Sequence, residues 1–164
     1  MANAVLAQFG TATAMDITTA SLASGSGRQT TMIDNTSAKF PALLIFVEIK
    51  MASGSAPTAN SIVEIYLIRG DAASPTISDD NAGASDAAWP PASTTGGPNA
   101  QLIGTLREGS SPATNDILYG SFYVENPGPL WGIGVINRTG QAFHATQPLT
   151  THAVRYVGMN LSIQ

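Results

Sequence analysis

The feature that most constrains the fold is an unbroken apolar row at every second position of residues 42–51, whose other row also carries Glu48 and Lys50. Every second position is apolar, with an unbroken row formed by Leu43, Ile45, Val47 and Ile49. Because successive side chains of a β-strand point to opposite faces, this period of two predicts a strand and not a helix. Residues 61–69 repeat the pattern with β-branched and aromatic residues. We expect these two strands to be sequential and antiparallel.

Further apolar segments are separated by turn residues along the rest of the chain. Four of them are clear, at 101–108, 116–125, 131–137 and 153–163, and two alternate more weakly, at 15–24 and 28–35. Glycine, proline and asparagine bound each clear segment, and no stretch of a dozen residues has a helical stripe. The pattern predicts an all-β fold, a two-sheet antiparallel β-sandwich of about eight strands.

The length of 164 residues suits one domain with one core. We place this domain at residues 15–164, preceded by a short N-terminal arm at 1–14 that is rich in alanine and threonine. The longest interruption, 70–100, contains proline, glycine and acidic residues. Structureless loops of this length are uncommon in compact domains and tend to be functional. We therefore expect the 70–100 loop to be an interaction surface.

The charge content is low for a protein that stays soluble as a monomer. The chain is 43% hydrophobic and only 11% charged, whereas globular proteins average about 25% charged residues. Soluble monomers carry a more mixed charge on their surface. The deficit indicates that partner subunits cover much of the surface.

Several classes of function find no support in the composition. The net charge is −4 and the seven lysines and arginines are scattered singly, so no basic patch for nucleic acid is predicted. Without cysteine the chain can form neither disulfides nor thiolate metal sites. No apolar run approaches the length of a membrane span, and the N-terminal residues do not resemble a secretory signal. We expect no membrane partner.

Acidic residues gather in the long loop, which carries Asp71, Asp79, Asp80 and Asp86. Several carboxylates on a loop suit calcium, a hard cation that prefers oxygen ligands. The spacing fits no established calcium loop, and the bidentate glutamate of an EF-hand is missing. We interpret these residues as solvated loop carboxylates, and no metal site is predicted.

Other candidate catalytic residues do not form a recognisable constellation. The two histidines, His144 and His152, lack a third zinc ligand, and no Gly-x-Ser-x-Gly motif supplies a nucleophile. Four glutamates lie on or beside predicted strands, and a facing pair could hydrolyse glycosides: Glu48, Glu64, Glu108 and Glu125. We interpret them as salt-bridged or solvated residues. The Gly-x-Gly motifs at 25–27 and 132–134 precede no helix, so we predict neither enzymatic activity nor a cofactor.

Aromatic residues occupy the second face of several strands. Phe46, Tyr66, Tyr119 and Tyr123 alternate with the uniformly apolar positions of their strands. Such residues serve equally in carbohydrate stacking and in protein interfaces. The alternative is that this face belongs to the same core, and the sequence leaves the three possibilities open.

The order of motifs resembles that of a group of tailed-bacteriophage structural proteins encoded with the capsid genes. The likeness includes the Leu-Ala-Ser-Gly-Ser-Gly-Arg-Gln-Thr-Thr-Met-Ile-Asp-Asn segment at 22–35, the alternating strand that begins at Leu43, and Val-Glu-Ile-Tyr-Leu at 63–67. It continues through Ala-Gly-Ala-Ser-Asp at 82–86 and Trp-Gly-Ile-Gly-Val-Ile-Asn-Arg-Thr-Gly at 131–140. Together these motifs are spread over residues 22–140, most of the length of the chain.

This resemblance implies a capsid decoration, or cement, protein of jelly-roll type. Such a protein lies on the outer capsid surface of the virion, forms a homo-oligomer, commonly a trimer, and binds across major capsid protein subunits. The low charge and the lack of a catalytic constellation agree with this role. A jelly roll alone does not determine function, because lectins and enzymes share the fold.

The contact elements that we expect are the N-terminal arm, the 70–100 loop and the aromatic strand faces. The partner-binding residues predicted on them are Val5, Leu6, Phe9, Phe46, Tyr66, Trp89, Tyr119 and Tyr123. The alternative is a jelly-roll module of a phage head or tail fibre that recognises host glycans through exposed tyrosine or tryptophan. An open pocket lined by Trp89 or Tyr119, together with glycan binding, would favour that alternative.

Overall fold

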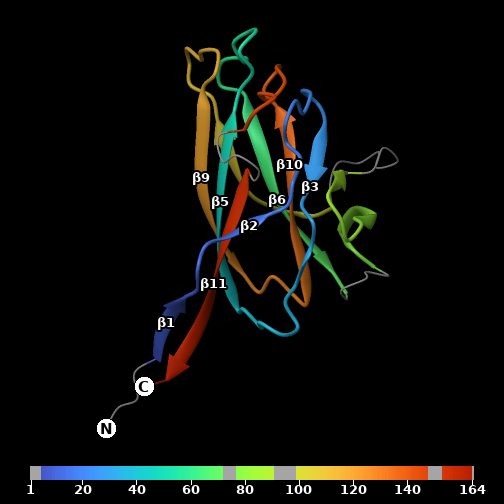
Figure 1. Ribbon diagram of the computed structural model, residues 1–164, viewed down its shortest axis with the longest axis vertical. Helices are drawn as coiled ribbons and strands as arrows, with labels where there is room; N and C mark the ends of the chain where they lie inside the picture. The colour runs from blue at the N-terminus through green and yellow to red at the C-terminus, as the bar shows by residue number, and fades with distance from the viewer. Residues whose placement is uncertain (1–4, 72–76, 91–98, 148–152, 164) are drawn as a thin grey trace.

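The computed structural model describes residues 5–71, 77–90, 99–147 and 153–163. Within them lie eleven strands and one short 3-10 turn, η1 (Asp79–Asn81). Figure 1 labels β1, β2, β3, β5, β6, β9, β10 and β11. The bounds are β1 (Val5–Phe9), β2 (Thr13–Met15), β3 (Gly27–Gln29), β4 (Ile33–Asp34), β5 (Ala42–Lys50), β6 (Ile62–Gly70), β7 (Ala87–Ala88), β8 (Gln101–Arg107), β9 (Ile117–Glu125), β10 (Leu130–Arg138) and β11 (Val154–Ile163).

The strands form two antiparallel sheets that pack face to face (Figure 1). Sheet A has the order β1-β11-β5-β9, and β2 pairs with β11 beside β1. Sheet B has the order β7-β3-β10-β6-β8, and β4 pairs with β10 beside β3. The pairing is nested: β2 and β11 enclose β3 and β10, which enclose β5 and β9, which enclose β6 and β8. The prediction of an all-β, two-sheet antiparallel sandwich is confirmed.

The clear strands of the sequence are present, but two expectations about the strands are wrong. The weak segments at 15–24 and 28–35 contain only the end of β2 and the short strands β3 and β4. The strands β5 and β6 are not hydrogen-bonded neighbours, because β5 belongs to sheet A and β6 to sheet B. The connection between them crosses from one sheet to the other, so their apolar rows face each other across the core.

The main core lies between the two sheets and is built from the alternating rows. The row of β5 that was predicted to be apolar is 0–3% exposed, and Val63, Ile65 and Leu67 of β6 are fully buried. Trp131 and Ile133 of β10 and Val154 of β11 complete the same cluster. The edge of the Trp131 indole meets the Tyr156 ring at a centroid distance of 5.0 Å. Burial of these rows holds the sheets together.

Part of the outer face of sheet B, over β6 and β10, is covered by the chain itself. Trp89, from the long loop, is 1% exposed and packs with Tyr66 and Ile68 of β6 and Leu130 and Ile136 of β10 in a second buried cluster. Its ring lies 5.4 Å from that of Tyr66, centroid to centroid. A Cβ atom at Gly134 would collide with the Trp89 indole, so the glycine makes room for this residue. The strand β10 is consequently buried on both faces from Leu130 to Asn137.

Carboxylates hold the described parts of the 70–100 loop in place. Asp86 accepts hydrogen bonds from the Arg28 guanidinium at 2.5 Å and from the Thr18 hydroxyl and backbone. Burial acts to raise the pKa of Asp86, but the hydrogen bonds from Arg28 and Thr18 outweigh it and lower the pKa. Asp80 accepts backbone hydrogen bonds from Asn99 and Ala100. The described residues of the loop are therefore held by hydrogen bonds, and the expectation that the loop is an interaction surface stays a prediction.

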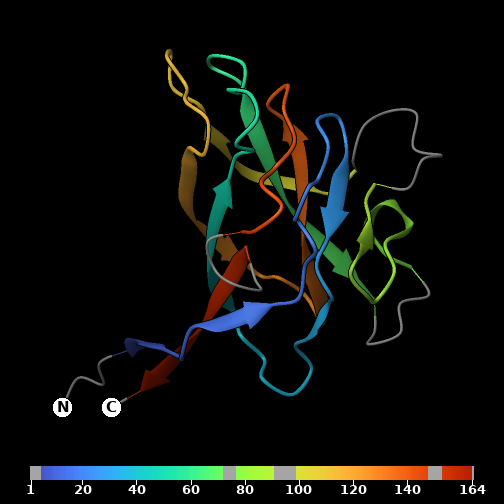
Figure 2. The same cartoon turned by 45° about the horizontal axis from the view of Figure 1, so that its top comes forward.

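The predicted N-terminal arm is part of sheet A and not a separate segment, as far as it lies within the described residues. β1 pairs with the end of β11, from Val5 opposite Ile163 to Phe9 opposite Met159. β2 pairs with the beginning of β11, and Met15 is fully buried in the core. In Figures 1 and 2, β1 and the end of β11 extend beyond the sandwich as a two-stranded ribbon. We call these two segments, 5–9 and 159–163, the terminal ribbon.

Replacing Trp89 with alanine tests whether the loop is fixed by this side chain. Because Trp89→Ala leaves a cavity in the second cluster, we expect the free energy of unfolding to fall by about 3–5 kcal/mol. Urea unfolding followed by fluorescence measures the loss. Leu102→Ala is the control, since Leu102 is 51% exposed on β8 and such a change costs at most about 0.5 kcal/mol.

A double-mutant cycle checks that the loss comes from the contact with Gly134. Gly134→Ala should destabilise the chain that contains Trp89 more strongly than the Trp89→Ala chain, where the space is open. Equal effects of Gly134→Ala in both backgrounds would contradict the packing described above.

Candidate interaction surface

The outer face of sheet A carries a continuous apolar surface with no covering segment in the described chain. Side chains directly opposite each other on antiparallel strands share a face, and the register therefore orders this surface in rows. Tyr123, Leu44 and Val157 form one row across β9, β5 and β11. Phe9 lies beside Met159 at the base of the terminal ribbon. We call the surface made of these rows the A face; its apolar members are Phe9, Leu44, Phe46, Tyr119, Tyr123, Val157, Met159 and Leu161.

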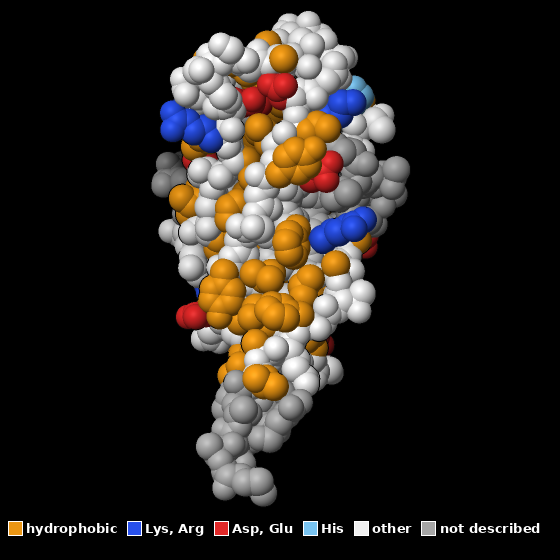
Figure 3. Space-filling view, turned by 90° about the vertical axis from the view of Figure 1, so that its left-hand side faces the viewer, with side chains coloured by type: hydrophobic (Ala, Val, Ile, Leu, Met, Phe, Trp, Pro, Cys, Tyr) orange, Lys and Arg blue, Asp and Glu red, His pale blue; other side chains and the backbone are white. Residues whose placement is uncertain are grey.

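Many of these side chains are in contact with solvent. Tyr119 and Leu161 are each 68% exposed, and Phe9, Tyr123 and Phe46 are 60%, 54% and 40% exposed. Figure 3 shows hydrophobic side chains gathered along this side of the molecule down to the ribbon, with charged side chains beside them. Isolated exposed apolar residues are common, whereas contiguous apolar patches mark interaction sites. The A face is the strongest candidate for a functional surface in the described chain.

Two shallow hollows interrupt the A face. One, of about 480 Å³, is lined by Phe46, Glu48, Tyr119 and Ser121. The other, of about 340 Å³, lies between Tyr123 of β9 and Leu161 of β11. Both are open and mainly apolar, so they suit the side chains of a protein partner or the flat face of a sugar ring.

Four charged residues stand on or beside the A face, and their charges balance. Glu48 and Lys50 lie on β5, Glu125 on β9 and Arg155 on β11. Neither ion pair found within the described residues involves any of these four, since the pairs are Arg28–Asp86 and Arg138–Glu64. Partial desolvation, followed by the negative charge of Glu125 and a hydrogen bond with it, raises the pKa of Tyr123.

The structure separates the predicted partner-binding residues into two groups. Phe46, Tyr119 and Tyr123 lie together on the A face, and Leu6 and Phe9 are exposed on the terminal ribbon. The prediction that Tyr66 and Trp89 offer a contact surface is wrong. They pack against each other in the second buried cluster and are only 8% and 1% exposed. The side chain of Val5 lies outside the described residues.

The acidic residues of the long loop have structural partners. Besides Asp80 and Asp86, Asp79 accepts a hydrogen bond from the backbone of Arg69, and Asp71 accepts one from Ile77. These carboxylates thus bind groups of the protein, and their presence in the loop does not require a metal ion. Among the described residues, no group of three or more histidines and acids is placed to hold a metal ion.

The remaining titratable candidates are dispersed over the molecule. Glu48 and Glu125 lie on the outer side of sheet A, and Glu64 pairs with Arg138 on sheet B. Glu108 is buried after β8. His144 accepts a hydrogen bond at Nδ1 from the Thr146 backbone, and His152 lies outside the described residues. The four glutamates thus do not converge on one site.

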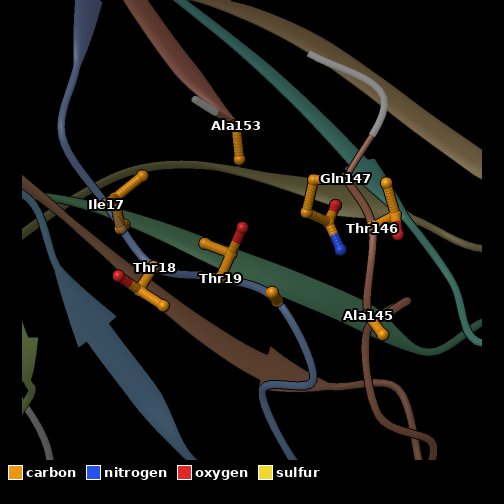
Figure 4. A pocket seen from close by; sticks show the side chains of 8 residues that line it. Ile17, Thr18, Thr19, Ala145, Thr146, Gln147 and Ala153 are labelled. Atoms are coloured by element: carbon orange, nitrogen blue, oxygen red, sulfur yellow. The ribbon is translucent and has the colours of Figure 1, made fainter. Parts of the chain in front are cut away.

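A third hollow, of about 210 Å³, lies between residues 17–20 and 145–147, near Ala153 (Figure 4). Threonine hydroxyls and the Gln147 amide supply its polar lining. The Gln147 amide is already engaged, because it accepts from Lys50 N at 2.9 Å and donates to the His144 carbonyl at 2.7 Å. No charged side chain lines this hollow, so it offers no acid or base for chemistry.

Comparisons with known proteins add no family to this geometry. No protein-family model, no curated protein and no solved structure matches the chain. Within the described residues, no helix is long and apolar enough to cross a membrane.

The contribution of β11 to the A face was not predicted from the sequence. The odd positions Arg155, Val157, Met159 and Leu161 alternate with positions that face the other side of the strand. This alternation is visible in the sequence and could have identified them as one face. That they lie on one face with Phe46 and Tyr123 depends on the pairing of β5 with both β11 and β9, which are far from β5 in the sequence, and the local pattern does not reveal this pairing.

The buried residue Glu108 predicts how the stability of the protein depends on pH. It is 2% exposed, and its Oε1 atom has no hydrogen-bond partner. Burial, together with the negative charge of Asp116, raises the pKa of Glu108. Because its pKa in the folded state exceeds that in the unfolded chain, the stability associated with this group is complete below the ordinary pKa and falls as the pH rises through the folded pKa.

Glu108→Gln should therefore stabilise the protein near neutral pH, because the amide never ionises. The advantage should vanish at a pH below about 4, where Glu108 itself is protonated. Urea unfolding of both chains at the two pH values measures the difference, and Glu48→Gln, on the outer side of sheet A, is the control. A loss of stability in Glu108→Gln at neutral pH would show instead that the ionised carboxylate is favourably bound.

Proposed function

We propose that this chain is a structural virion protein that decorates and stabilises a bacteriophage capsid by binding across major capsid protein subunits. The observation that carries the proposal is the asymmetry of the sandwich: the chain covers part of sheet B with its own loop and leaves the A face apolar and exposed. An exposed apolar surface of this kind suits association with other proteins. The resemblance of the motifs at 22–35 and 131–140 directs the proposal to the capsid.

Under this proposal the sandwich is a jelly roll, the fold of many capsid proteins. The nested pairing supports it, since a jelly roll is one long antiparallel ribbon whose paired halves roll into two sheets. The innermost pair is β6 with β8, and the outermost pairs join β1 and β2 to β11. No acid–base pair converges on any of the three hollows described above.

The terminal ribbon is the proposed contact with the capsid. Leu6 and Phe9 are 45% and 60% exposed on β1, and the ribbon extends beyond the sandwich (Figure 2). A two-stranded ribbon is only marginally stable in water without a surface to pack on. A homo-oligomer on the outer capsid surface would present several ribbons at once, so weak individual contacts would add up through avidity.

Removing residues 1–9 tests the attachment. We expect the truncated chain to keep its sandwich, because β2 and the core residue Met15 remain. Its binding to capsid shells that lack this protein should fall by about tenfold or more as contacts are lost from every copy. Co-sedimentation with shells of the phage that encodes the chain measures the bound fraction.

A matched control changes an exposed loop far from the ribbon. Ser53→Asp with Ser55→Asp alters the β5–β6 connection, where both serines are exposed, and should leave the bound fraction unchanged. If the truncated chain bound as well as the full chain, the ribbon would not be the attachment element. If the full chain did not bind, the decoration role itself would be contradicted.

A second candidate function is glycan recognition, and the hollow beside Tyr119 favours it. Tyr119 and Phe46 flank this open hollow, and Glu48 and Ser121 provide polar groups at its edge. Aromatic faces with nearby hydrogen-bonding groups are suited to sugar rings. This role would place the chain in a head or tail fibre and not in the capsid surface.

A glycan array probed with the purified chain separates the two functions. The decoration role predicts no glycan that binds with micromolar or better affinity. The fibre role predicts binding that Tyr119→Ala abolishes and that Leu102→Ala, a change on the exposed part of sheet B, leaves intact.

A further inference from the structure

The A face carries both halves of a complementary charge pair, placed on opposite sides of its apolar rows. Glu125 ends β9 and lies opposite Ala42 of β5, whereas Arg155 is the second residue of β11 and lies opposite Phe46. Strands are about 4.8 Å apart and rise about 3.4 Å per residue. The two charges are therefore separated by roughly 10 Å across the sheet and roughly 14 Å along it. Leu44 lies midway between them.

This separation prevents the two residues from pairing within one chain. Neither belongs to an ion pair among the described residues, and the apolar row Tyr123, Leu44 and Val157 lies between them. Because Glu125 and Arg155 carry opposite charges, the surface as a whole repels neither a positive nor a negative partner. Another copy of the same surface supplies the opposite charge for each of them, in a pair of subunits or in a closed ring.

We propose that the A face is an interface between copies of this chain, in which Glu125 of one copy meets Arg155 of another around an apolar centre formed by Leu44, Phe46 and Tyr123. The interface removes the exposed aromatic residues from water, and this burial drives association. The charge pair at its margin sets the relative orientation of the copies. The inference does not depend on the capsid role, since it concerns self-association in solution.

The A face suits a second copy better than an unrelated acidic or basic partner. With Glu48, Lys50, Glu125 and Arg155 in place, it has two charges of each sign. A strongly charged partner would meet as much repulsion as attraction, whereas an identical copy offers Arg155 to Glu125 and Glu125 to Arg155. The low overall charge of the chain, 11% of its residues, agrees with burial of surface between subunits.

Charge reversal tests the contact directly. Sedimentation velocity of the purified full chain at tens of micromolar should show two or more copies per particle. Glu125→Arg and Arg155→Glu, each alone, bring like charges together and should weaken association by at least tenfold. The double variant restores opposite charges between copies and should recover association to within about threefold of the original chain.

Two further variants separate the interface from general effects. Leu44→Asn, at the apolar centre, should produce monomers even when it is combined with the double charge reversal. Arg107→Glu, an exposed position on β8 of sheet B, should leave association unchanged. Urea unfolding of each variant at low concentration shows that the monomer remains folded.

The outcomes decide the proposal. Loss in each single variant with recovery in the double variant supports the contact between Glu125 and Arg155. A full chain that remains monomeric at about 100 µM overturns the interface. Association that the single reversals leave unchanged, or that the double reversal fails to restore, overturns the charge pairing.

Discussion

The packing of Trp89 on Gly134 determines which side of the sandwich is closed. The strand β10 is apolar on both faces, so it requires cover on its outer side as well as a core on its inner side. The loop supplies that cover with one indole, and the bonds of Asp86 with Arg28 and Thr18 hold the loop in position. No comparable segment of the described chain lies over sheet A. Its outer face therefore keeps aromatic residues in contact with water.

The strands themselves could be predicted because their signal is local. In β5 the row of every second residue that the local pattern predicts to be apolar is buried in the structure, and the row between is mostly half-buried. The choice of sheet is not local, and for this reason the predicted pairing of β5 with β6 is wrong. The connection between them, residues 51–61, has the composition of either a turn or a crossing. The assignment of strands to sheets depends on pairings such as that of β2 with β11, which joins segments near the two ends of the chain and has no local signal.

The candidate surface could be predicted in part for a related reason. Phe46 on β5 and Tyr66 on β6 have the same position in the same pattern, yet one is 40% exposed and the other 8%. The difference arises from Trp89, which is more than twenty residues away from Tyr66 and belongs to a different segment. A residue's own strand shows which face it occupies. Whether that face meets solvent depends on what the rest of the chain places over it.

The terminal ribbon and the A face form one continuous apolar surface, and this continuity links the two proposed roles. Met159 joins them, since it lies opposite Phe9 in the ribbon and opposite Ala42 in the sandwich. Copies that meet on the A face would bring their ribbons close together, and each ribbon would gain a surface on which to pack. A two-stranded ribbon that is marginal alone becomes stable under these conditions. Self-association would then order the element that we propose to reach the capsid, so the oligomer and not the single chain would be the form that binds.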